Sequence, residues 1–346
     1  MIVFRTDANQ NIGMGHLMRC LSLAQEAKRQ GIDCTFCVAR ETEKRLVLDK
    51  GFDCYQLQTP YNAMDDEIPQ LEKIIKDLSP KILIVDGYFV TKNYFEQIRK
   101  LVTVAYIDDI LAFAYPVDIL INYNIYANEK EYRVVYNGSE EQVRYVLGPR
   151  FAPLREEFQS CEQPFSQVVE KVLISTGGAD TEHVALQIMQ YVATENERDI
   201  EFHFVIGALN KDLPQIEALA KQCENVVLHR NVTKMSELMR ACDLAVSASG
   251  STLYELCACG VPTVTYVLAD NQVRAAKAFA EQGIMISIGD IREKPDFVKE
   301  IMLSINELRK NSLLRQTLRE KMRSVTDGKG ANYTITEIKN ILKGEK

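Results

Sequence analysis

The sequence has 346 residues, which predicts two domains because domains commonly contain about 100–200 residues. Hydrophobic residues make up 46% and charged residues 26%, as is typical of a globular protein, and the formal net charge of −7 argues against a general nucleic-acid binder. No apolar run reaches the length of a membrane span and the first residues do not resemble a signal peptide, so we expect a cytoplasmic protein whose nine cysteines stay reduced.

Short runs rich in Val and Ile alternate with amphipathic helical stretches in the first part of the chain. The runs expected as strands are residues 2–4, 35–39, 82–86, 102–109 and 118–122. Continuous apolar strands are typical of a parallel sheet that is covered on both faces, and their alternation with helices predicts a doubly wound α/β layer. Residues 123–167 break this pattern, and we expect them to be irregular.

A second α/β series follows the irregular segment. Its expected strands are residues 172–176, 201–207, 225–229, 244–249, 262–268 and 285–289. We place the boundary between about 150 and 167 and expect domains over 1–150 and 151–330, with a helix at 331–346 that packs back on the first domain. Residues 294–346 are expected to form two or three charged amphipathic helices. Two Rossmann-like domains in tandem predict a cleft, with ligands bound beyond the carboxyl ends of the strands.

The stretch "IGMGHLMRCLSLAQEAKRQG" (12–31) places two glycines and a histidine before a helical pattern. Gly13 and Gly15 are expected in the loop between the first strand and the first helix, where backbone can approach a ligand and a helix start favours an anion. The pattern is neither a Walker A loop nor G-x-G-x-x-G. His16 is either a general base or a polar residue that opens a helix, and this stretch alone leaves both interpretations open.

The stretch "SASGSTLYELCACGVP" (247–262) runs from a strand into another helix start. Donors there suit a diphosphate, and Glu255 could accept hydrogen bonds from a ribose diol. A capped helix with a favourably placed glutamate is the alternative. The residues expected at the diphosphate are Ser249, Gly250, Ser251 and Thr252.

Two more loops follow predicted strands of the second half. Gly177 and Gly178 of "STGGAD" would bring backbone close to a diphosphate or a sugar, and Asn271 with Gln272 would offer amides to a sugar. Because four such helix starts occur over both halves, we favour a nucleotide-sugar site. No D-x-D tripeptide and no G-x-S-x-G elbow is present, so neither a common metal-held diphosphate site nor a hydrolase elbow is supported. A sugar diphosphate has a good leaving group, and one histidine with one helix start would suffice.

Taken together, the motifs resemble a known family. They are "FRTDANQNIGMGHLMRCLSLA", "VDGYF", "YIDD", "LGPRFAPLR", "STGGAD", "SASGSTLYELCACGVPTV", "DNQ" and "DGKGA". Their order is similar to that of the UDP-2,4-diacetamido-2,4,6-trideoxy-β-L-altropyranose hydrolases of pseudaminic acid biosynthesis, a family that includes spore-coat polysaccharide biosynthesis proteins. The stretch 249–264 also resembles the bacterial peptidoglycan N-acetylglucosaminyltransferase and other UDP-sugar enzymes of the glycosyltransferase B fold.

The resemblance implies that fold, with two doubly wound domains facing a cleft and UDP held mainly by the second. It implies inverting water attack at the anomeric carbon with C–O cleavage, and neither a metal nor another cofactor. His16 would be the base, and the tyrosine of "VDGYF" maps to Tyr88, although Gly87 stands where some members have serine. Residues 249–255 map to the diphosphate and ribose, and Asn271 and Gln272 map near the sugar or phosphate.

We therefore expect a metal-independent UDP-sugar hydrolase whose partners are a UDP-linked diacetamido-trideoxyhexose and UDP, with no nucleic acid and no membrane. The sugar stereoisomer and the oligomeric state stay open. Two alternatives remain, a glycosyltransferase of the same fold that uses a UDP-amino sugar and a nucleotide-sugar-binding protein without turnover. A Rossmann-type dehydrogenase is disfavoured because G-x-G-x-x-G is missing.

The other three histidines and the cysteines receive structural interpretations. His203 is expected on a strand face, His229 in a loop where uracil would meet backbone groups, and His183 at a helix start where it caps the helix or lines the cleft. "CTFC" (34–37) has no second C-x-x-C to complete a zinc site. The cysteines expected as buried thiols are Cys20, Cys34, Cys37, Cys54, Cys242 and Cys257.

Overall fold

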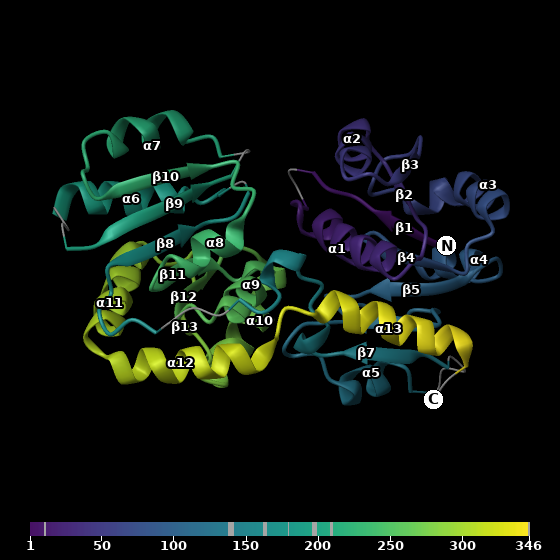
Figure 1. Cartoon of the computed structure of the whole chain (residues 1–346). Coiled ribbons are helices and arrows are strands. Elements are labelled where there is room, and N and C mark those ends of the chain that lie inside the picture. Colours follow the sequence, from purple (N-terminus) through teal and green to yellow (C-terminus); the bar gives the residue numbers. More distant parts are fainter. Residues whose placement is uncertain are drawn as a thin grey trace. The chain divides into compact units, whose positions relative to one another are not determined.

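The chain forms two compact units in the computed structural model, which describes residues 1–9, 12–137, 142–161, 165–178, 180–195, 199–207 and 210–344. The first unit comprises Met1–Arg155 and Lys329–Lys346, and the second comprises Glu156–Gly328. The chain therefore leaves the first unit after Arg155 and rejoins it at Lys329 (Figure 1). Each unit has its own sheet and its own apolar core.

The first unit is built on a parallel sheet with the strand order β3-β2-β1-β4-β5-β6-β7. Its strands are β1 (Ile2–Thr6), β2 (Cys34–Val38), β3 (Asp53–Gln56), β4 (Ile82–Asp86), β5 (Thr103–Ile107), β6 (Ile119–Asn122) and β7 (Arg144–Leu147). Its helices are α1 (Gly15–Arg29), α2 (Glu41–Asp49), α3 (Ile68–Leu78), α4 (Lys92–Ile98), α5 (Glu129–Val135) and α13 (Gly330–Lys343). Strand order reverses between β1 and β4, which are direct neighbours in the sheet.

Helix α1 follows from its apolar spacing and ends at a glycine, as predicted. Its buried side chains include Leu17, Cys20 and Leu21, and Gly31 takes φ +74° just beyond its end, a conformation that glycine adopts without strain. Helix α13 packs on α1, where Asn332 Nδ2 donates to Glu26 Oε1 at 2.7 Å. The final helix thereby completes the first unit.

The expectation of an irregular chain over residues 123–167 was wrong. The segment contains α5 and the edge strand β7, and the separate edge strand β3 also had no expected counterpart. Both strands have only four residues and carry polar side chains. An edge strand has a neighbouring strand on one side only, so its other side can carry polar residues. Neither gives the apolar run that marks the central strands.

The second unit repeats the same winding with the strand order β10-β9-β8-β11-β12-β13. Its strands are β8 (Lys171–Ser175), β9 (Glu201–Ile206), β10 (Val226–Arg230), β11 (Leu244–Ala248), β12 (Thr263–Val267) and β13 (Ile286–Asp290). Its helices are α6 (Val184–Glu195), α7 (Leu213–Ala220), α8 (Met235–Arg240), α9 (Thr252–Cys259), α10 (Asp270–Glu281), α11 (Phe297–Lys310) and α12 (Ser312–Val325). The expectation of two or three helices over 294–346 is confirmed by α11, α12 and α13.

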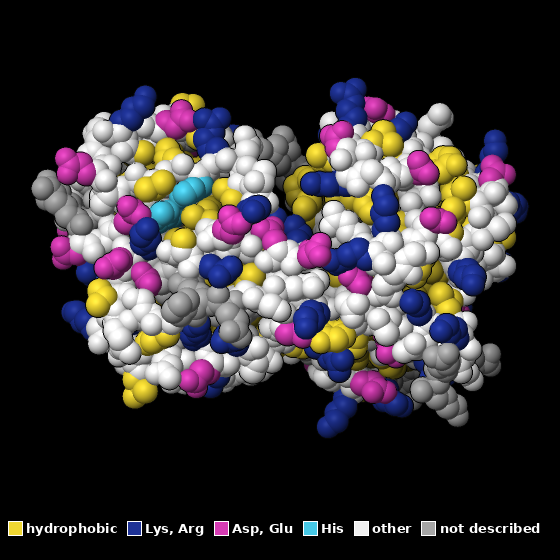
Figure 2. Space-filling model, in the orientation of Figure 1, with side chains coloured by type: hydrophobic (Ala, Val, Ile, Leu, Met, Phe, Trp, Pro, Cys, Tyr) yellow, Lys and Arg dark blue, Asp and Glu magenta, His cyan; other side chains and the backbone are white. Residues whose placement is uncertain are grey.

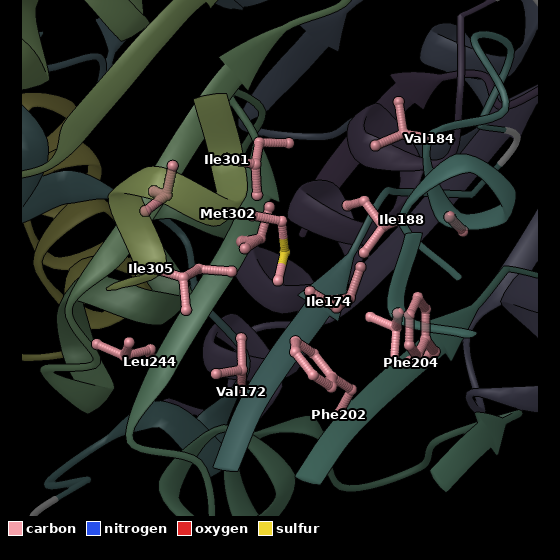
Figure 3. Packing of buried hydrophobic residues seen from close by; sticks show 14 of the residues in the cluster. Val172, Ile174, Val184, Ile188, Phe202, Phe204, Leu244, Ile301, Met302 and Ile305 are labelled. Carbon is pink, nitrogen blue, oxygen red and sulfur yellow. The ribbon is translucent and has the colours of Figure 1, made fainter. Parts of the chain in front are cut away.

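The core of the second unit lies between its sheet and helices α6, α7, α11 and α12. Figure 3 shows Phe202 and Phe204 of β9 beside Ile174 of β8. The alternate residue Leu173 is also fully buried, so β8 is covered on both faces, as the continuous apolar run predicted. No helix in the described part of the chain is long and apolar enough to cross a membrane.

Candidate functional site

The reversal of strand order in the first unit brings together residues that are distant in sequence. Thr6 at the end of β1 pairs with Asp86 at the end of β4, so the loops that follow both strands start side by side. Such a reversal is where open α/β sheets bind ligands, because the helices that follow the two strands lie on opposite faces and leave a crevice. His16 follows β1 on the first turn of α1, and Tyr88 follows β4.

His16 is buried against the carboxylate of Asp86. The His16 side chain is 4% exposed, and its Nδ1 lies 2.6 Å from Asp86 Oδ1. An ionised carboxylate accepts hydrogen bonds, so Nδ1 carries the proton and the Nε2 lone pair is left as the proton acceptor. In the structure His16 lies at the start of a helix, and it also has a carboxylate partner of the kind that orients a general base.

Arg19 fixes the ionisation state of Asp86. Its Nε donates to Asp86 Oδ2 and its Nη2 to Asp86 Oδ1, both at 2.5 Å. Burial alone would raise the pKa of Asp86, but the Arg19 guanidinium and the His16 ring outweigh it and hold the pKa of this carboxyl well below its usual range. Asp86 is therefore a stable acceptor for the His16 Nδ1 proton.

Asp109 is a second carboxylate on the other side of Arg19. Arg19 Nη2 lies 2.9 Å from Asp109 Oδ2, and Arg19 Nη1 donates to the Tyr123 hydroxyl at 2.8 Å. Tyr88 donates to Asp109 Oδ2 at 3.4 Å, and its ring meets the His16 ring edge-on with centroids 4.5 Å apart. The structure therefore brings the predicted residues His16 and Tyr88 into contact.

The glycines before α1 lie in two different environments. Gly13 takes φ +74° in a tight loop, where its amide donates to Asn9 O at 2.8 Å. Gly15 was expected in this loop but is the first residue of α1. A side chain at either position would meet no described atom within 4 Å, so open space adjoins the backbone here.

Three exposed apolar side chains follow neighbouring strands of the first sheet. Met14, Phe89 and Ile110 are 36%, 40% and 41% exposed. They follow β1, β4 and β5, which are neighbouring strands. We call these three residues the apolar rim.

The loops of the second unit gather in the same way at the carboxyl ends of its strands. Strands β9, β8, β11 and β12 are consecutive in the sheet, so the loops that follow them are neighbours. Gly177, with φ +87°, and Gly178 follow β8 and are exposed. A side chain on Gly207, after β9, would come within 2.3 Å of Gly178 O, so these two loops are packed backbone to backbone.

The helix start after β11 divides its residues between packing and exposure. Ser249 is 2% exposed, and its hydroxyl lies 2.7 Å from Thr265 Oγ1 and donates to Tyr266 O at 2.8 Å, so this side chain ties β11 to β12. The Ser249 hydroxyl thus makes packing contacts between the two strands, and its expected contact with a diphosphate stays a prediction. Ser251 is exposed and precedes the first turn of α9, where Thr252 lies.

The remaining predicted residues of the second unit occupy helix starts. Glu255 lies in the first turn of α9, and Gly250 donates its amide to Ala248 O at 2.8 Å in the turn before that helix. Asn271 lies exposed in the first turn of α10. Gln272 turns back on the chain, because its Oε1 accepts from the Leu268 amide at 2.9 Å.

The other histidines make local contacts. His183 Nδ1 lies 2.6 Å from Asp212 Oδ2 just before α6, which agrees with its expected place at a helix start. His203 lies on β9 and its Nδ1 is 2.8 Å from His229 Nε2. The expectation of a loop around His229 was wrong, because the residue lies within β10. Histidine side chains are visible together over β9 and β10 in Figure 2.

Most predicted thiols are buried. Cys20, Cys34, Cys37, Cys242 and Cys257 are buried. Cys54 is only half-buried, because it lies on the polar edge strand β3. Burial raises the pKa of the Cys37 thiol to about 12, which makes it a poor nucleophile near neutral pH.

Sequence reasoning missed Asp86, Arg19 and Asp109, although it quoted the motifs that contain all three of them. Arg19 carries a usable signal, because it lies three residues after His16 on the same face of α1 and is 8% exposed. A charge in the buried stripe of a helix needs a partner. The identity of that partner depends on strand order, which no local pattern contains.

Part of the chain matches a known domain family, and most of it is similar in sequence to known proteins. Residues 161–330 match the model of the glycosyltransferase family 28 C-terminal domain. The spore coat polysaccharide biosynthesis protein SpsG of Bacillus subtilis is 24% identical over 351 residues, which are 98% of this chain and 98% of SpsG. The UDP-2,4-diacetamido-2,4,6-trideoxy-beta-L-altropyranose hydrolase of Campylobacter jejuni is 26% identical over 288 residues, which are 82% of this chain and 97% of that enzyme. The uncharacterized protein MJ1062 of Methanocaldococcus jannaschii is 23% identical over 290 residues, or 79% of this chain, but the match spans only 56% of MJ1062.

Solved structures show the fold. The MurG structure of Acinetobacter baumannii matches with a TM-score of 0.71 at 14% identity and covers 98% of this chain and 99% of MurG. The calicheamicin glycosyltransferase CalG4 matches with a TM-score of 0.67 at 14% identity, covering 99% of this chain and 98% of CalG4. The prediction of two Rossmann-like domains of the glycosyltransferase B type is thereby confirmed. Residues 161–330 thus match the glycosyltransferase family 28 C-terminal domain, and the chain is similar at low identity to proteins named UDP-2,4-diacetamido-2,4,6-trideoxy-beta-L-altropyranose hydrolases.

Proposed function

We propose that the chain hydrolyses a UDP-linked 2,4-diacetamido-2,4,6-trideoxyhexose to UDP and the free sugar, as a step of nonulosonate (pseudaminic acid) biosynthesis. The relatives named as hydrolases support the reaction class, and the match to one of them spans 97% of that enzyme. The observation that carries the proposal is the contact between His16 and Asp86 at the reversal of strand order. It supplies an oriented base where a fold of this kind binds its ligand.

In the proposed reaction His16 Nε2 takes a proton from water while the water oxygen attacks the anomeric carbon. The bond between that carbon and the diphosphate oxygen breaks, and its electron pair leaves with UDP. Asp86 accepts the Nδ1 hydrogen bond throughout and so keeps the ring oriented as the imidazolium forms. Tyr88 holds the plane of the His16 ring through its edge-on contact.

The second unit supplies the UDP site in this proposal. The exposed backbone of Gly177 and Gly178 and the start of α9 at Ser251 and Thr252 would stabilise the diphosphate as it gains negative charge. Gly250 keeps the approach to that helix start free of a side chain. Glu255 and Asn271 are assigned to the ribose and to the sugar or phosphate, and Gln272 to the shape of the loop between β12 and α10.

The apolar rim supports an N-acetylated deoxy sugar as the substrate. A hexose with all its hydroxyl groups would place polar atoms against Met14, Phe89 and Ile110, whereas acetamido methyl groups and a C6 methyl group would bury apolar surface there. Loss of the Phe89 ring should therefore weaken binding of the diacetamido sugar more than that of UDP.

The deciding experiment separates hydrolysis from its two alternatives. The protein is incubated without any acceptor with a panel of UDP-linked diacetamido-trideoxyhexoses, and UDP and reducing sugar are measured. Release of both in equal amounts supports the hydrolase. Release that requires an added acceptor would identify a transferase, and UDP binding without release from any member of the panel would identify a binding protein.

The role of His16 is tested by His16→Asn. We expect kcat to fall by about 10²–10⁴-fold, the usual contribution of a general base, while the Kd for UDP changes less than threefold. His203→Gln is the matched control, because it changes a buried histidine on β9 that lies outside the proposed machinery. A kcat for His16→Asn within threefold of wild type would remove His16 from the chemistry.

A further inference from the structure

The charge around His16 is unusual because its carboxylate partner is already neutralised. Arg19 donates to both oxygens of Asp86, so this pair has no net charge. A neutral pair gives little support to a new positive charge in a buried site. Protonation of His16 during catalysis would leave the three groups His16, Asp86 and Arg19 with one net positive charge.

Asp109 supplies the negative charge that balances a protonated His16 ring. Its carboxylate lies 2.9 Å from Arg19 Nη2 and has only 12% of its side chain exposed. Together with Asp109 the cluster has one net negative charge when the His16 ring is neutral and no net charge when the ring is protonated. Asp109 therefore favours the state in which His16 has taken the proton.

The remaining groups around His16 do not supply this charge. Burial raises the pKa of Tyr123 to about 12, so its phenol stays neutral, and burial also raises the pKa of the Cys20 thiol, whose Sγ lies 3.5 Å from Asp86. Tyr88 contributes a neutral ring edge. Asp108, the neighbour of Asp109 in sequence, instead accepts hydrogen bonds from the hydroxyls of Tyr115 and Tyr132.

Asp109 is also held rigidly in place. Asn124 Nδ2 donates to Asp109 Oδ1 at 3.0 Å, and the Tyr126 hydroxyl donates to the Asp109 backbone oxygen at 2.9 Å. Tyr88 donates to the other carboxylate oxygen. One carboxylate thus contacts both the cation beside Asp86 and the aromatic ring beside His16.

We propose that Asp109 is a positioning residue for the base, which balances the charge of Arg19 and orients Tyr88 so that His16 can accept a proton from water. The inference rests on the proposed hydrolase function. It assigns to the second aspartate of "YIDD" a task distinct from that of Asp86, because Asp86 orients the ring and Asp109 sets the charge of its surroundings.

The test compares kcat and kcat/KM against pH in wild type, Asp109→Asn and Asp109→Glu. In Asp109→Asn we expect kcat to fall at least tenfold with KM within threefold, and the acid limb of kcat/KM to move to lower pH by about one unit. The sign follows because loss of a negative charge disfavours the protonated ring. Asp109→Glu keeps the charge and should restore the position of the limb.

Asp118→Asn is the matched control. It removes the same charge beside another arginine, since Arg99 Nε donates to Asp118 Oδ1 at 2.9 Å. Asp118 directly precedes β6 and so lies at the amino ends of the parallel strands, whereas Asp109 follows β5 at their carboxyl ends. An unmoved limb in Asp109→Asn, or an equal shift of the limb in Asp118→Asn, would overturn the inference.

A measurement without substrate separates the inference from the proposed function. The His16 ring signal is followed by NMR in protein with 15N-labelled histidine, with His16→Asn for its assignment. We expect its titration to move to lower pH in Asp109→Asn and to stay in place in Asp118→Asn. If wild type releases no UDP, the proposed function fails, whereas an unmoved His16 titration contradicts the role of Asp109 alone.

Discussion

Asp86→Asn replaces the carboxylate at the centre of the His16 cluster by an amide of the same shape. Asp86 is 1% exposed and accepts from Arg19 Nε, Arg19 Nη2 and His16 Nδ1 at 2.5, 2.5 and 2.6 Å. An asparagine has one oxygen and one NH₂ group, so its nitrogen must face a donor of either Arg19 or His16. Removal of one partner of a buried ion pair costs about 3–5 kcal/mol, since the other charge stays buried.

The expected change is large enough to measure by calorimetry and urea unfolding. For a unit of this size, about 2–4 °C of melting temperature corresponds to 1 kcal/mol, so the first unit should melt about 6–20 °C earlier. Hydrogen exchange at the amides of β4 assigns the loss to this unit. The kcat should fall by up to about 10²–10⁴-fold as well, because the His16 ring loses its fixed orientation.

The dependence on pH gives a second check. The pKa of Asp86 is lowered in the folded protein, so its contribution to stability is present above its unfolded pKa of about 4 and is lost as the pH falls through the lower folded value. The difference between wild type and Asp86→Asn should therefore shrink in acid. Asp118→Asn, with 31% of its side chain exposed, should cost no more than about 1 kcal/mol. The reasoning would be refuted by a loss for Asp86→Asn no larger than that of Asp118→Asn.

Three further predictions concern the second unit and the final helix. The hydrogen bond to Asp212 raises the pKa of His183, so the stability it gives is present below pH about 6.5 and is lost as the pH rises through the higher folded value. Urea unfolding between pH 5 and 9 should show a decline of less than about 1 kcal/mol in the free energy of unfolding, because His183 is more than half exposed. Asp212→Asn should abolish this decline, and an unchanged decline in that variant would contradict the link to Asp212. Gly178→Ala should leave the urea midpoint unchanged, since the added methyl meets open space, but should raise the Kd for UDP in calorimetric titration; unchanged affinity would argue against close backbone approach there. Gly330→Ala would place Cβ 2.0 Å from Ala152 O and should destabilise the first unit by about 1–3 kcal/mol in urea unfolding, whereas wild-type stability would show that α13 can shift.

The features predicted correctly from sequence are those whose cause is local. The four apolar residues of β4 that precede Asp86 are buried because a central parallel strand is covered on both faces, and this requirement produces a run of consecutive apolar residues in the sequence. Helix α1 and Gly31 follow from spacing and backbone conformation. The edge strand β7 was missed because only Val146 in it is buried.

The site was predictable only in part, for a physical reason. His16 and Tyr88 lie beside glycines or within recognisable motifs, so local sequence points to them. Asp86 acquires its role from the parallel pairing of β4 with β1, and Asp109 from the reach of Arg19 across the ends of β4 and β5. Both roles depend on contacts between residues that are far apart in sequence, and the spacing of residues along the chain does not reveal such contacts.

The return of α13 to the first unit has a consequence for synthesis on the ribosome. Helix α1 leaves the ribosome early, but its partner α13 emerges only after every other described helix and strand. Until then the surface of α1 that meets Asn332 and Lys339 has no cover, since Glu26 and Gln30 await their hydrogen bonds. The second unit, which is continuous in sequence, can complete its fold first. We therefore expect a released chain truncated after residue 328 to have a folded second unit and a first unit in which the surface of α1 that α13 covers is exposed.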